Sequence, residues 1–211
     1  MSLEELREQN KENVAACALE HFIQNGIEPS KISDIAKKAG VTSRSVYRYF
    51  ETKADLVLQA ALLFWEQTVA ESEKVWDNPH LQSMSGASQI EAVLKAYAHQ
   101  YVASKEKLVF IQEAEVYLHR NGKIAPIQNK APINFLSGKG PLNRAIHKGI
   151  MDGTVKNSPN LELLYYNAYD SLLGLMQKMA VGDADDWQKN CDGMARIDAF
   201  CKMLARSFSE Q

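Results

Sequence analysis

Side chains that can contact nucleic acid gather in the segment from Ser30 to Lys53. This segment holds six lysines and arginines against two acidic residues, Asp34 and Glu51, whereas the whole chain has a net charge of −2. Arginine pairs with guanine through two hydrogen bonds, and lysines, hydroxyls and helix N-termini bind phosphates. A compact basic patch on a mildly acidic chain predicts a DNA-contacting surface, although a solvated basic face has the same local charge.

The candidate contacts to DNA form two sets. Those for the groove share the face of one predicted helix that lies opposite Val46 and Phe50: Ser43, Arg44, Tyr47 and Arg48. Those for phosphates carry hydroxyl or ammonium groups around the same helix: Thr42, Ser45, Tyr49 and Lys53. The aromatic residues could instead belong to the core. At about 100° per residue, Tyr47 and Tyr49 cannot both share the buried face, so at least one of them points outward.

A helix, a tight turn and a second helix must position these side chains. Helical spacing predicts helices over 3–25, 31–39 and 43–49. Gly26 and Gly40 are expected to end the first two, and Ser30, Thr42 and Thr52 to cap the helices that follow them. The buried faces then form a small three-helix core from Val14, Ala18, Phe22, Ile35, Ala36, Val46 and Phe50. This arrangement is a helix-turn-helix, in which the second helix enters the major groove.

The rest of the sequence is also helical in pattern. Further helices are predicted at 53–76, 88–104, 106–120, 139–152, 160–181 and 185–208, and no strand pattern is present. The segment 121–140 is rich in glycine and proline and is expected to be a loop. It is either a mobile loop beside a pocket or an irregular connection. The predicted fold class is all-α.

Between about Val14 and Leu56 the sequence resembles the tetracycline-repressor (TetR) family. The resemblance rests on an ordered set of residues: Ala15, Ala16, Phe22, Gly26, Ile35-Ala36, Ala39-Gly40-Val41, Val46-Tyr47, Tyr49-Phe50 and Lys53. It implies a helix-turn-helix DNA-binding domain at 1–52 and a helical ligand-binding and dimerisation domain at 53–211. It also implies that Tyr47 contacts DNA and that Lys53 binds a phosphate. Arg44 departs from the residues usual in the family, so the operator need not resemble that of a relative. His21 also departs from the usual aliphatic residue, and we expect it to be a hydrogen-bonded histidine at the edge of the core rather than a pH sensor.

The last two predicted helices, 160–181 and 185–208, each carry a broad apolar stripe. Two adjacent amphipathic helices can pair with their symmetry mates in a four-helix dimer interface, and the resemblance implies the same arrangement. The alternative is that both stripes only close the core of one chain. We expect a homodimer, because a two-fold operator presents two half-sites about one helical turn apart.

The middle of the sequence supplies candidates for binding a small-molecule effector. They are mostly aromatic: Trp65, Tyr97, Tyr101, Phe110 and Tyr117, with His147 as a polar candidate. Glu115 is expected on the most apolar arc of helix 106–120, whereas Glu113 is expected to be solvated. A carboxylate on an apolar arc is costly unless it is paired, so Glu115 either binds ligand or pairs internally.

Other classes of protein find little support in the residues. Cys17, Cys191 and Cys201 form no CxxC pair and the five histidines form no HxxxH pair, so no disulfide, metal or cofactor is expected. No apolar run reaches the roughly 18 residues of a membrane helix, and the polar N-terminus is not a signal peptide, so a cytoplasmic location is expected.

The sequence therefore predicts a DNA-binding transcriptional regulator. We expect a dimeric repressor that binds palindromic operator DNA and is released by a small-molecule effector. One alternative is a regulator or activator that needs no ligand. A helical small-molecule enzyme is the least favoured alternative, because no nucleophile–base pair or phosphate loop is evident.

Overall fold

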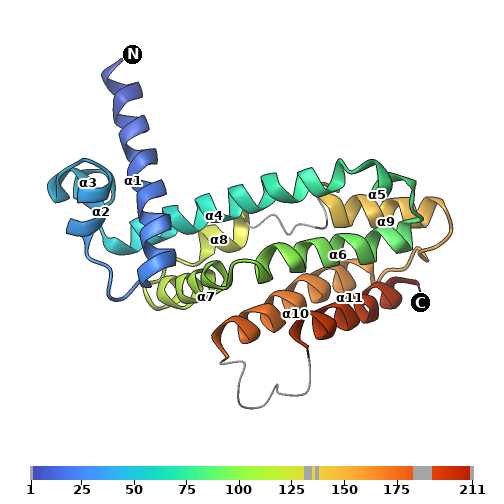
Figure 1. The fold of residues 1–211 in the computed structure, drawn as a ribbon. Coiled ribbons are helices and arrows are strands. Elements are labelled where there is room, and N and C mark those ends of the chain that lie inside the picture. Colours follow the sequence, from blue (N-terminus) through green and yellow to red (C-terminus); the bar gives the residue numbers. More distant parts are fainter. Residues whose placement is uncertain (1, 131–134, 136–137, 183–191, 210–211) are drawn as a thin grey trace. The chain divides into compact units, whose positions relative to one another are not determined.

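The computed structural model describes residues 2–130, 135, 138–182 and 192–209. Within these ranges the regular elements are helices and no strand occurs, which confirms the all-α prediction. The helices follow one another (Figure 1) as α1 (Leu3–Asn25), α2 (Ile32–Lys38), α3 (Ser43–Tyr49), α4 (Lys53–Trp76), α5 (Pro79–Ser83), α6 (Gly86–Val102), α7 (Lys105–Arg120), α8 (Ala125–Lys130), α9 (Pro141–Met151), α10 (Leu161–Val181) and α11 (Gly193–Ser209).

Two short helices, α5 and α8, lie where the sequence predicts loops. Proline is compatible with a first helical turn, where its missing N–H has no helical partner to lose. Pro79 opens α5 behind Asn78, whose side chain accepts a hydrogen bond from the His80 N–H at 3.0 Å, and Pro126 lies in the first turn of α8. At the other end of the chain, the predicted helix 185–208 is described only from Gly193, because residues 183–191 lie outside the described residues.

Most of the predicted helix ends are confirmed by their hydrogen bonds. The Thr42 hydroxyl accepts from the Ser45 N–H at 3.1 Å, and the Thr52 hydroxyl accepts from the Asp55 N–H at 3.2 Å. Gly26 ends α1 with φ of +77°. The predicted cap at Ser30 is wrong: Lys31 precedes α2 without a side-chain bond, and the Ser30 hydroxyl donates to the Gly26 carbonyl at 2.5 Å. That carbonyl at the end of α1 lacks a helical partner, so it competes for the hydroxyl.

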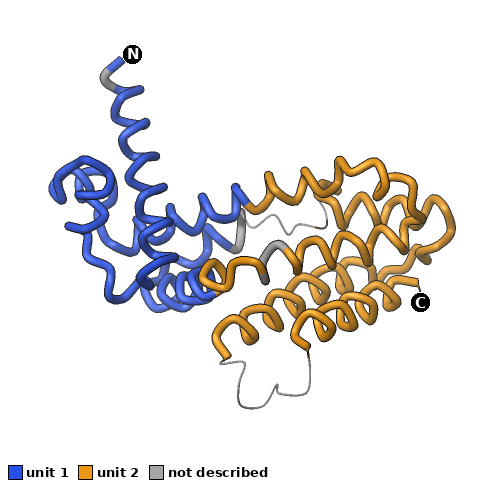
Figure 2. The backbone as a smooth tube through the Cα atoms, viewed as in Figure 1, with its two compact units in different colours: residues 1–67, 109–131 blue, residues 68–108, 132–211 orange. Residues whose placement is uncertain are grey.

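The first compact unit comprises residues 1–67 and 109–131, shown in blue in Figure 2. The seven predicted core residues of the helix-turn-helix are all buried in it. Phe110 of α7 adds to this core, because its ring stacks on Phe22 of α1 at 6.3 Å between centroids and meets Phe64 of α4 at 6.1 Å. The compact unit around the helix-turn-helix thus also contains α7 from Val109 onward and α8, and the functional division after residue 52 stays a prediction.

The second compact unit comprises residues 68–108 and 132–211, shown in orange in Figure 2. In this unit α6 packs against α9, α10 and α11, and α10 packs against α11. The first residue of α6, Gly86, lies against the backbone of Gly149 in α9. Its N–H donates to the Asp152 carboxylate at 2.8 Å, which fixes the start of α6 on the end of α9. Among the described residues, no helix combines the length and the apolar character that crossing a membrane requires.

Candidate nucleic-acid interface

A glycine turn sets the angle between α2 and α3. Gly40 has φ of +69°, a conformation that strains any other L-residue. The Val41 N–H donates to the Ala36 carbonyl at 3.0 Å and the Gly40 N–H to the Lys37 carbonyl at 3.2 Å, which is a Schellman arrangement. The Asn13 side-chain amide of α1 also donates to the Ala39 carbonyl at 3.1 Å. The turn is therefore held from both sides, and α3 has one defined direction.

The two faces of α3 differ sharply in exposure. Val46 and Phe50 are 1% and 5% exposed, whereas Tyr47 is 51% exposed. Arg44 and Arg48 are also exposed, and Tyr49 is half-buried. Tyr47 is therefore the tyrosine that points outward. The four residues predicted for the groove lie on the side of α3 away from the core, with Ser43 half-buried at its start.

Arg48 and Tyr49 are neighbours that order each other at the surface. The Arg48 guanidinium lies 5.4 Å from the centre of the Tyr49 ring and donates to the Tyr49 hydroxyl at 3.4 Å. A cation over an aromatic face loses some of its rotamer freedom before any ligand arrives. Thr42 and Ser45 are the other predicted phosphate contacts around α3. Their hydroxyl groups are hydrogen-bonded to each other at the N-terminal cap, with 3.0 Å between the oxygens.

Lys53 opens α4 and is already held by one hydrogen bond. Its ammonium donates to the Glu28 backbone carbonyl at 3.1 Å, in the turn that joins α1 to α2. Partial burial lowers the pKa of Lys53, and the charge of Glu28 opposes that shift. An ammonium has three donors, so two remain for a phosphate.

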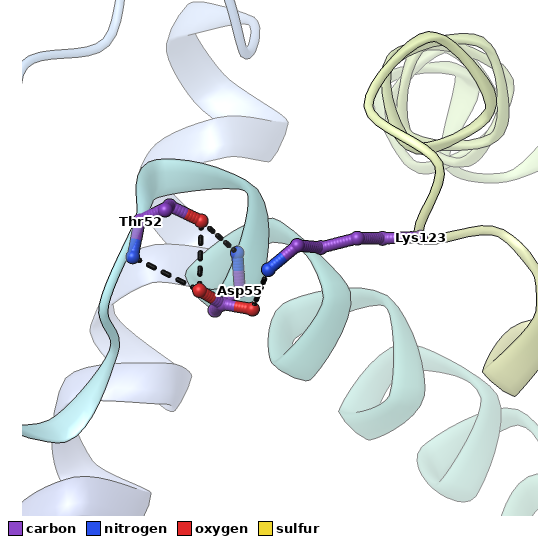
Figure 3. A network of polar contacts seen from close by, with 3 residues as sticks. All are labelled: Thr52, Asp55 and Lys123. Atoms are coloured by element: carbon purple, nitrogen blue, oxygen red, sulfur yellow. Dashed lines mark hydrogen bonds and ion pairs between the residues drawn. The ribbon is translucent and has the colours of Figure 1, made fainter.

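Two further residues near Lys53 were not identified from the sequence. Lys123, in the loop between α7 and α8, forms an ion pair with Asp55 of α4, and Asp55 also bonds Thr52 (Figure 3). Glu113 of α7 accepts a hydrogen bond from the Ile27 N–H at 3.0 Å. The predicted exposure of Glu113 is confirmed, and its carboxylate is in addition bonded to the backbone just after α1. Only the Thr52–Asp55 spacing carried a signal in the sequence, as a capping pair.

Comparison with known proteins identifies the domain that presents this surface. Residues 15–60 match the sequence profile of bacterial regulatory proteins of the tetR family. The match spans the second half of α1, then α2, α3 and the start of α4, so it includes the turn and the exposed face of α3. The chain therefore carries the DNA-binding domain of the TetR family. It is a transcriptional regulator of that family, with a DNA-binding helix-turn-helix.

Other proteins match this chain beyond the helix-turn-helix. The fatty acid metabolism regulator protein of Bacillus subtilis (strain 168) is 26% identical over 149 residues, which are 69% of this chain and 71% of that protein. The fatty acid degradation regulator FadR from Bacillus halodurans has a TM-score of 0.67 at 16% identity, covering 92% of this chain and 94% of that one. FadR from Bacillus subtilis in complex with stearoyl-CoA has a TM-score of 0.64 at 18% identity, covering 92% and 96%. At these identities the solved structures show a shared fold.

The predicted effector residues are divided between the two units of this TetR-family protein. Trp65, Phe110, Glu115 and Tyr117 belong to the first unit, and Tyr97 and His147 to the second. The side chain of Tyr101 lies outside the described residues. Trp65 and Phe110 are 4% and 1% exposed and both contact Phe64, so they are part of one aromatic cluster. His147 is exposed on α9.

Glu115 does not occupy the centre of the apolar arc of α7. The fully buried residues of that arc are Leu108, Ile111, Ala114 and Leu118, and Glu115 is half-buried beside them. A helix turns by about 100° per residue, so Ala114 and Glu115 lie on opposite sides of Ile111 and Leu118, and of these two Glu115 is the one that stays half-buried. Tyr117 is half-buried on the same helix, and this burial, with the charge of Glu28, raises its pKa.

A small cavity in the second unit lies beside Tyr97. It is lined by Ser72, Val75, Val93, Tyr97, Pro141 and Tyr169 and has a volume of about 20 Å³. That volume holds about one water molecule, so an organic ligand needs the lining side chains to move apart. Among the described residues, no group of three histidine, cysteine, aspartate or glutamate side chains could hold a metal ion.

Part of each apolar stripe that suggested dimerisation is buried within the chain itself. Leu161, Tyr165, Ala168, Leu172 and Met176 of α10 are at most 4% exposed. In α11, Ile197, Cys201 and Phe208 are fully buried. These buried residues close the core of the second unit, whereas Leu164 and Leu175 of α10 and Met194 and Leu204 of α11 are half-buried. Dimerisation through these two helices stays a prediction. The apolar side chains that α10 and α11 leave exposed are Leu163, Val181 and Met203.

Proposed function

We propose that this TetR-family protein is a dimeric repressor that binds two-fold operator DNA and is released by a fatty acyl-CoA. The observation that carries the DNA-binding part is the contrast on α3, where Tyr47 is 51% exposed and Val46 is 1% exposed. Arg44 and Arg48 stand on the same exposed side. A short helix with arginine and tyrosine on its free face can reach base edges in the major groove.

Dimerisation follows from the size of the recognition element. α3 has 7 residues, too few to supply specific affinity from one half-site, and a two-fold operator needs two such helices about one turn apart. The interface is proposed on the faces of α10 and α11 that point away from the core of the second unit. Met203 is 57% exposed there, beside the small side chain of Ala199, and Leu163 is 60% exposed on α10.

The effector class is proposed from the relatives. The protein matched over 71% of its length is a fatty acid metabolism regulator, and a structural relative holds stearoyl-CoA. The only room described near Tyr97 is about 20 Å³, so an acyl chain can enter only a more open state of the helices. A ligand that binds one state better shifts the population toward it, which is the requirement for release from DNA.

The DNA-binding part is tested by selecting duplexes from a random pool and measuring affinity by fluorescence anisotropy. Replacing Arg44 or Tyr47 by alanine should weaken binding to the selected duplex about 5- to 150-fold, as expected for loss of about 1–3 kcal/mol of base contact. Arg120→Ala, which removes an exposed arginine from the end of α7, is the matched control. Unchanged affinity in both α3 variants contradicts the proposal.

The dimer is tested by sedimentation. The wild type should have twice the chain mass of 23.7 kDa. Met203→Glu should shift the protein toward monomer and weaken operator binding, because it places a charge in an apolar contact. Met151, which is 86% exposed on α9, provides the control substitution Met151→Glu. A wild-type monomer that binds the two-fold duplex with full affinity rules the dimer out.

The effector is tested by titrating stearoyl-CoA into the protein–operator complex, with free coenzyme A as control. Release should correspond to a loss of affinity of about 5- to 150-fold, from a coupling of about 1–3 kcal/mol. The ligand should also raise the melting temperature of the free protein. Equal affinity of the ligand-saturated and ligand-free protein for the operator favours a ligand-independent regulator instead.

A further inference from the structure

Two side chains from the α7–α8 region bind residues next to Lys53 or next to its backbone acceptor, Glu28. Lys123 pairs with Asp55, 68 residues earlier in the chain, and Glu113 accepts from the Ile27 N–H, 86 residues earlier. All four residues belong to the first compact unit. These bonds join the α7–α8 region to the turn before α2 and to the first turn of α4. These two places lie directly before and directly after the helix-turn-helix formed by α2 and α3.

Lys123 acts on the first turn of α4 through Asp55 (Figure 3). One carboxylate oxygen of Asp55 accepts from the Thr52 N–H at 2.9 Å and from the Thr52 hydroxyl at 2.7 Å. The other carboxylate oxygen accepts from the Lys123 ammonium. Asp55 thus caps the helix with one oxygen and is held by Lys123 with the other. The hydrogen bond from Lys123 is the main cause of the lowered pKa of Asp55.

Glu113 acts on the turn between α1 and α2. Its carboxylate accepts from the Ile27 N–H at 3.0 Å, and a Cβ placed on Gly26 would lie 3.5 Å from the same oxygen. The next residue, Glu28, offers the carbonyl that holds the Lys53 ammonium at 3.1 Å. Glu113 therefore fixes the backbone directly before the acceptor of Lys53.

We propose that Lys123 and Glu113 are positioning residues for operator binding, which hold the two backbone segments that aim Lys53 at a DNA phosphate. This inference rests on the proposed function. Asp55 lies two residues after Lys53, and Ile27 lies one residue before Glu28. Lys53 thus depends on two anchors, Lys123 and Glu113. Loss of Lys123 frees the first turn of α4, and loss of Glu113 frees the backbone before Glu28. Neither Lys123 nor Glu113 is required to touch DNA.

The test compares Lys123→Met and Glu113→Ala with Lys53→Met for affinity toward the selected duplex at several salt concentrations. Each anchor variant should bind about two- to tenfold more weakly, the range for losing one hydrogen bond or partly exposed ion pair. The slope of log affinity against log salt should fall by about one in all three, since one phosphate contact is lost. Lys123→Arg and Glu113→Gln keep the charge or the acceptor and should recover most of the affinity.

Two features separate positioning from general charge or stability effects. Glu113→Ala removes a negative charge, so simple electrostatics predicts tighter DNA binding, whereas positioning predicts weaker binding. In a Lys53→Met background, Lys123→Met should cause no further loss, because the group that it positions is gone. If Glu113→Ala does not fold, this double-variant comparison decides the matter.

The inference alone is overturned if Glu113→Ala binds DNA as tightly as the wild type. It is also overturned if the affinity losses of Lys53→Met and Lys123→Met add up in the double variant. A wild-type protein that binds no duplex overturns the proposed function, and the inference with it.

Discussion

Gly86 provides the sharpest test of the packing in the second unit. A Cβ at this position would overlap the backbone N and Cα of Gly149 and lie 2.8 Å from the Lys148 carbonyl carbon. The start of α6 cannot move away freely, because the Gly86 and Ala87 N–H groups donate to Asp152 and Thr154 at 2.8 Å and 3.1 Å. Gly86→Ala must therefore separate α6 from α9 or break these bonds.

The expected cost of Gly86→Ala follows from what the methyl group meets. Overpacking against side chains that can adjust costs about 1–3 kcal/mol. Here the obstacle is backbone, so we expect about 3 kcal/mol or more, which lowers the melting temperature by about 6–12 °C in a protein of this size. Gly149→Ala meets the Val155 side chain instead, at 2.8 Å from its Cβ, and should be relieved in part by Val155→Ala.

Thermal and urea unfolding measure the effect, with Gly174→Ala as the control. A Cβ on Gly174 of α10 meets nothing within 4 Å. Replacing a helical glycine by alanine in open space should stabilise the protein by about 0.5–1 kcal/mol. Sedimentation checks that the oligomeric state is unchanged. The reasoning is refuted if Gly86→Ala melts with the wild type, or if Gly174→Ala is destabilised as much as Gly86→Ala.

Burial raises the pKa of the Cys201 thiol to about 11, so iodoacetamide near pH 8 should label Cys201 far more slowly in folded than in unfolded protein, as measured by peptide mass spectrometry. The bond from Lys123 lowers the pKa of Asp55 below its ordinary 3.8, so Asp55 adds stability above that pH, which is lost as pH falls through the lowered value. Asp55→Asn should therefore cost stability to urea near pH 7 and progressively less below pH 4; a cost that does not change with pH contradicts this. Trp65 is 4% exposed, and its indole N–H has no hydrogen-bond partner among the described residues. Trp65→Phe should cost less than about 3 kcal/mol of unfolding free energy in urea, because the cavity left by the smaller ring is offset in part by deletion of an unsatisfied donor, and a larger loss contradicts this.

Local rules were sufficient for the helix-turn-helix. Gly40 must follow α2 because a left-handed residue closes the helix, and Thr42 must precede α3 because its hydroxyl binds a free N–H three residues on. Periodicity separated Val46 from Tyr47 in the same way. These signals act within about one turn of chain, so they can be read from neighbouring residues without knowledge of the fold.

Periodicity was less reliable where one pattern allowed two partners. The stripes on α10 and α11 show that each of these helices buries one face. Only the packed structure shows that α10 and α11 cover each other and that α6 covers both. Ser30 failed as a cap for a related reason, since the Gly26 carbonyl was the competing acceptor. The pattern of polar and apolar residues identifies which face of a helix is buried, but it does not identify the element that packs against that face.

The amino-acid order alone determined the helical class, the turn geometry at Gly40 and the outward direction of Tyr47, because each depends on bonds between residues a few positions apart. Tertiary structure decided the bonds of Lys123 to Asp55 and of Glu113 to Ile27, and the contact of Gly86 with Gly149. These contacts join positions more than sixty residues apart in the chain. Whether two such residues meet depends on the packing of whole helices, which the spacing of neighbouring residues does not specify.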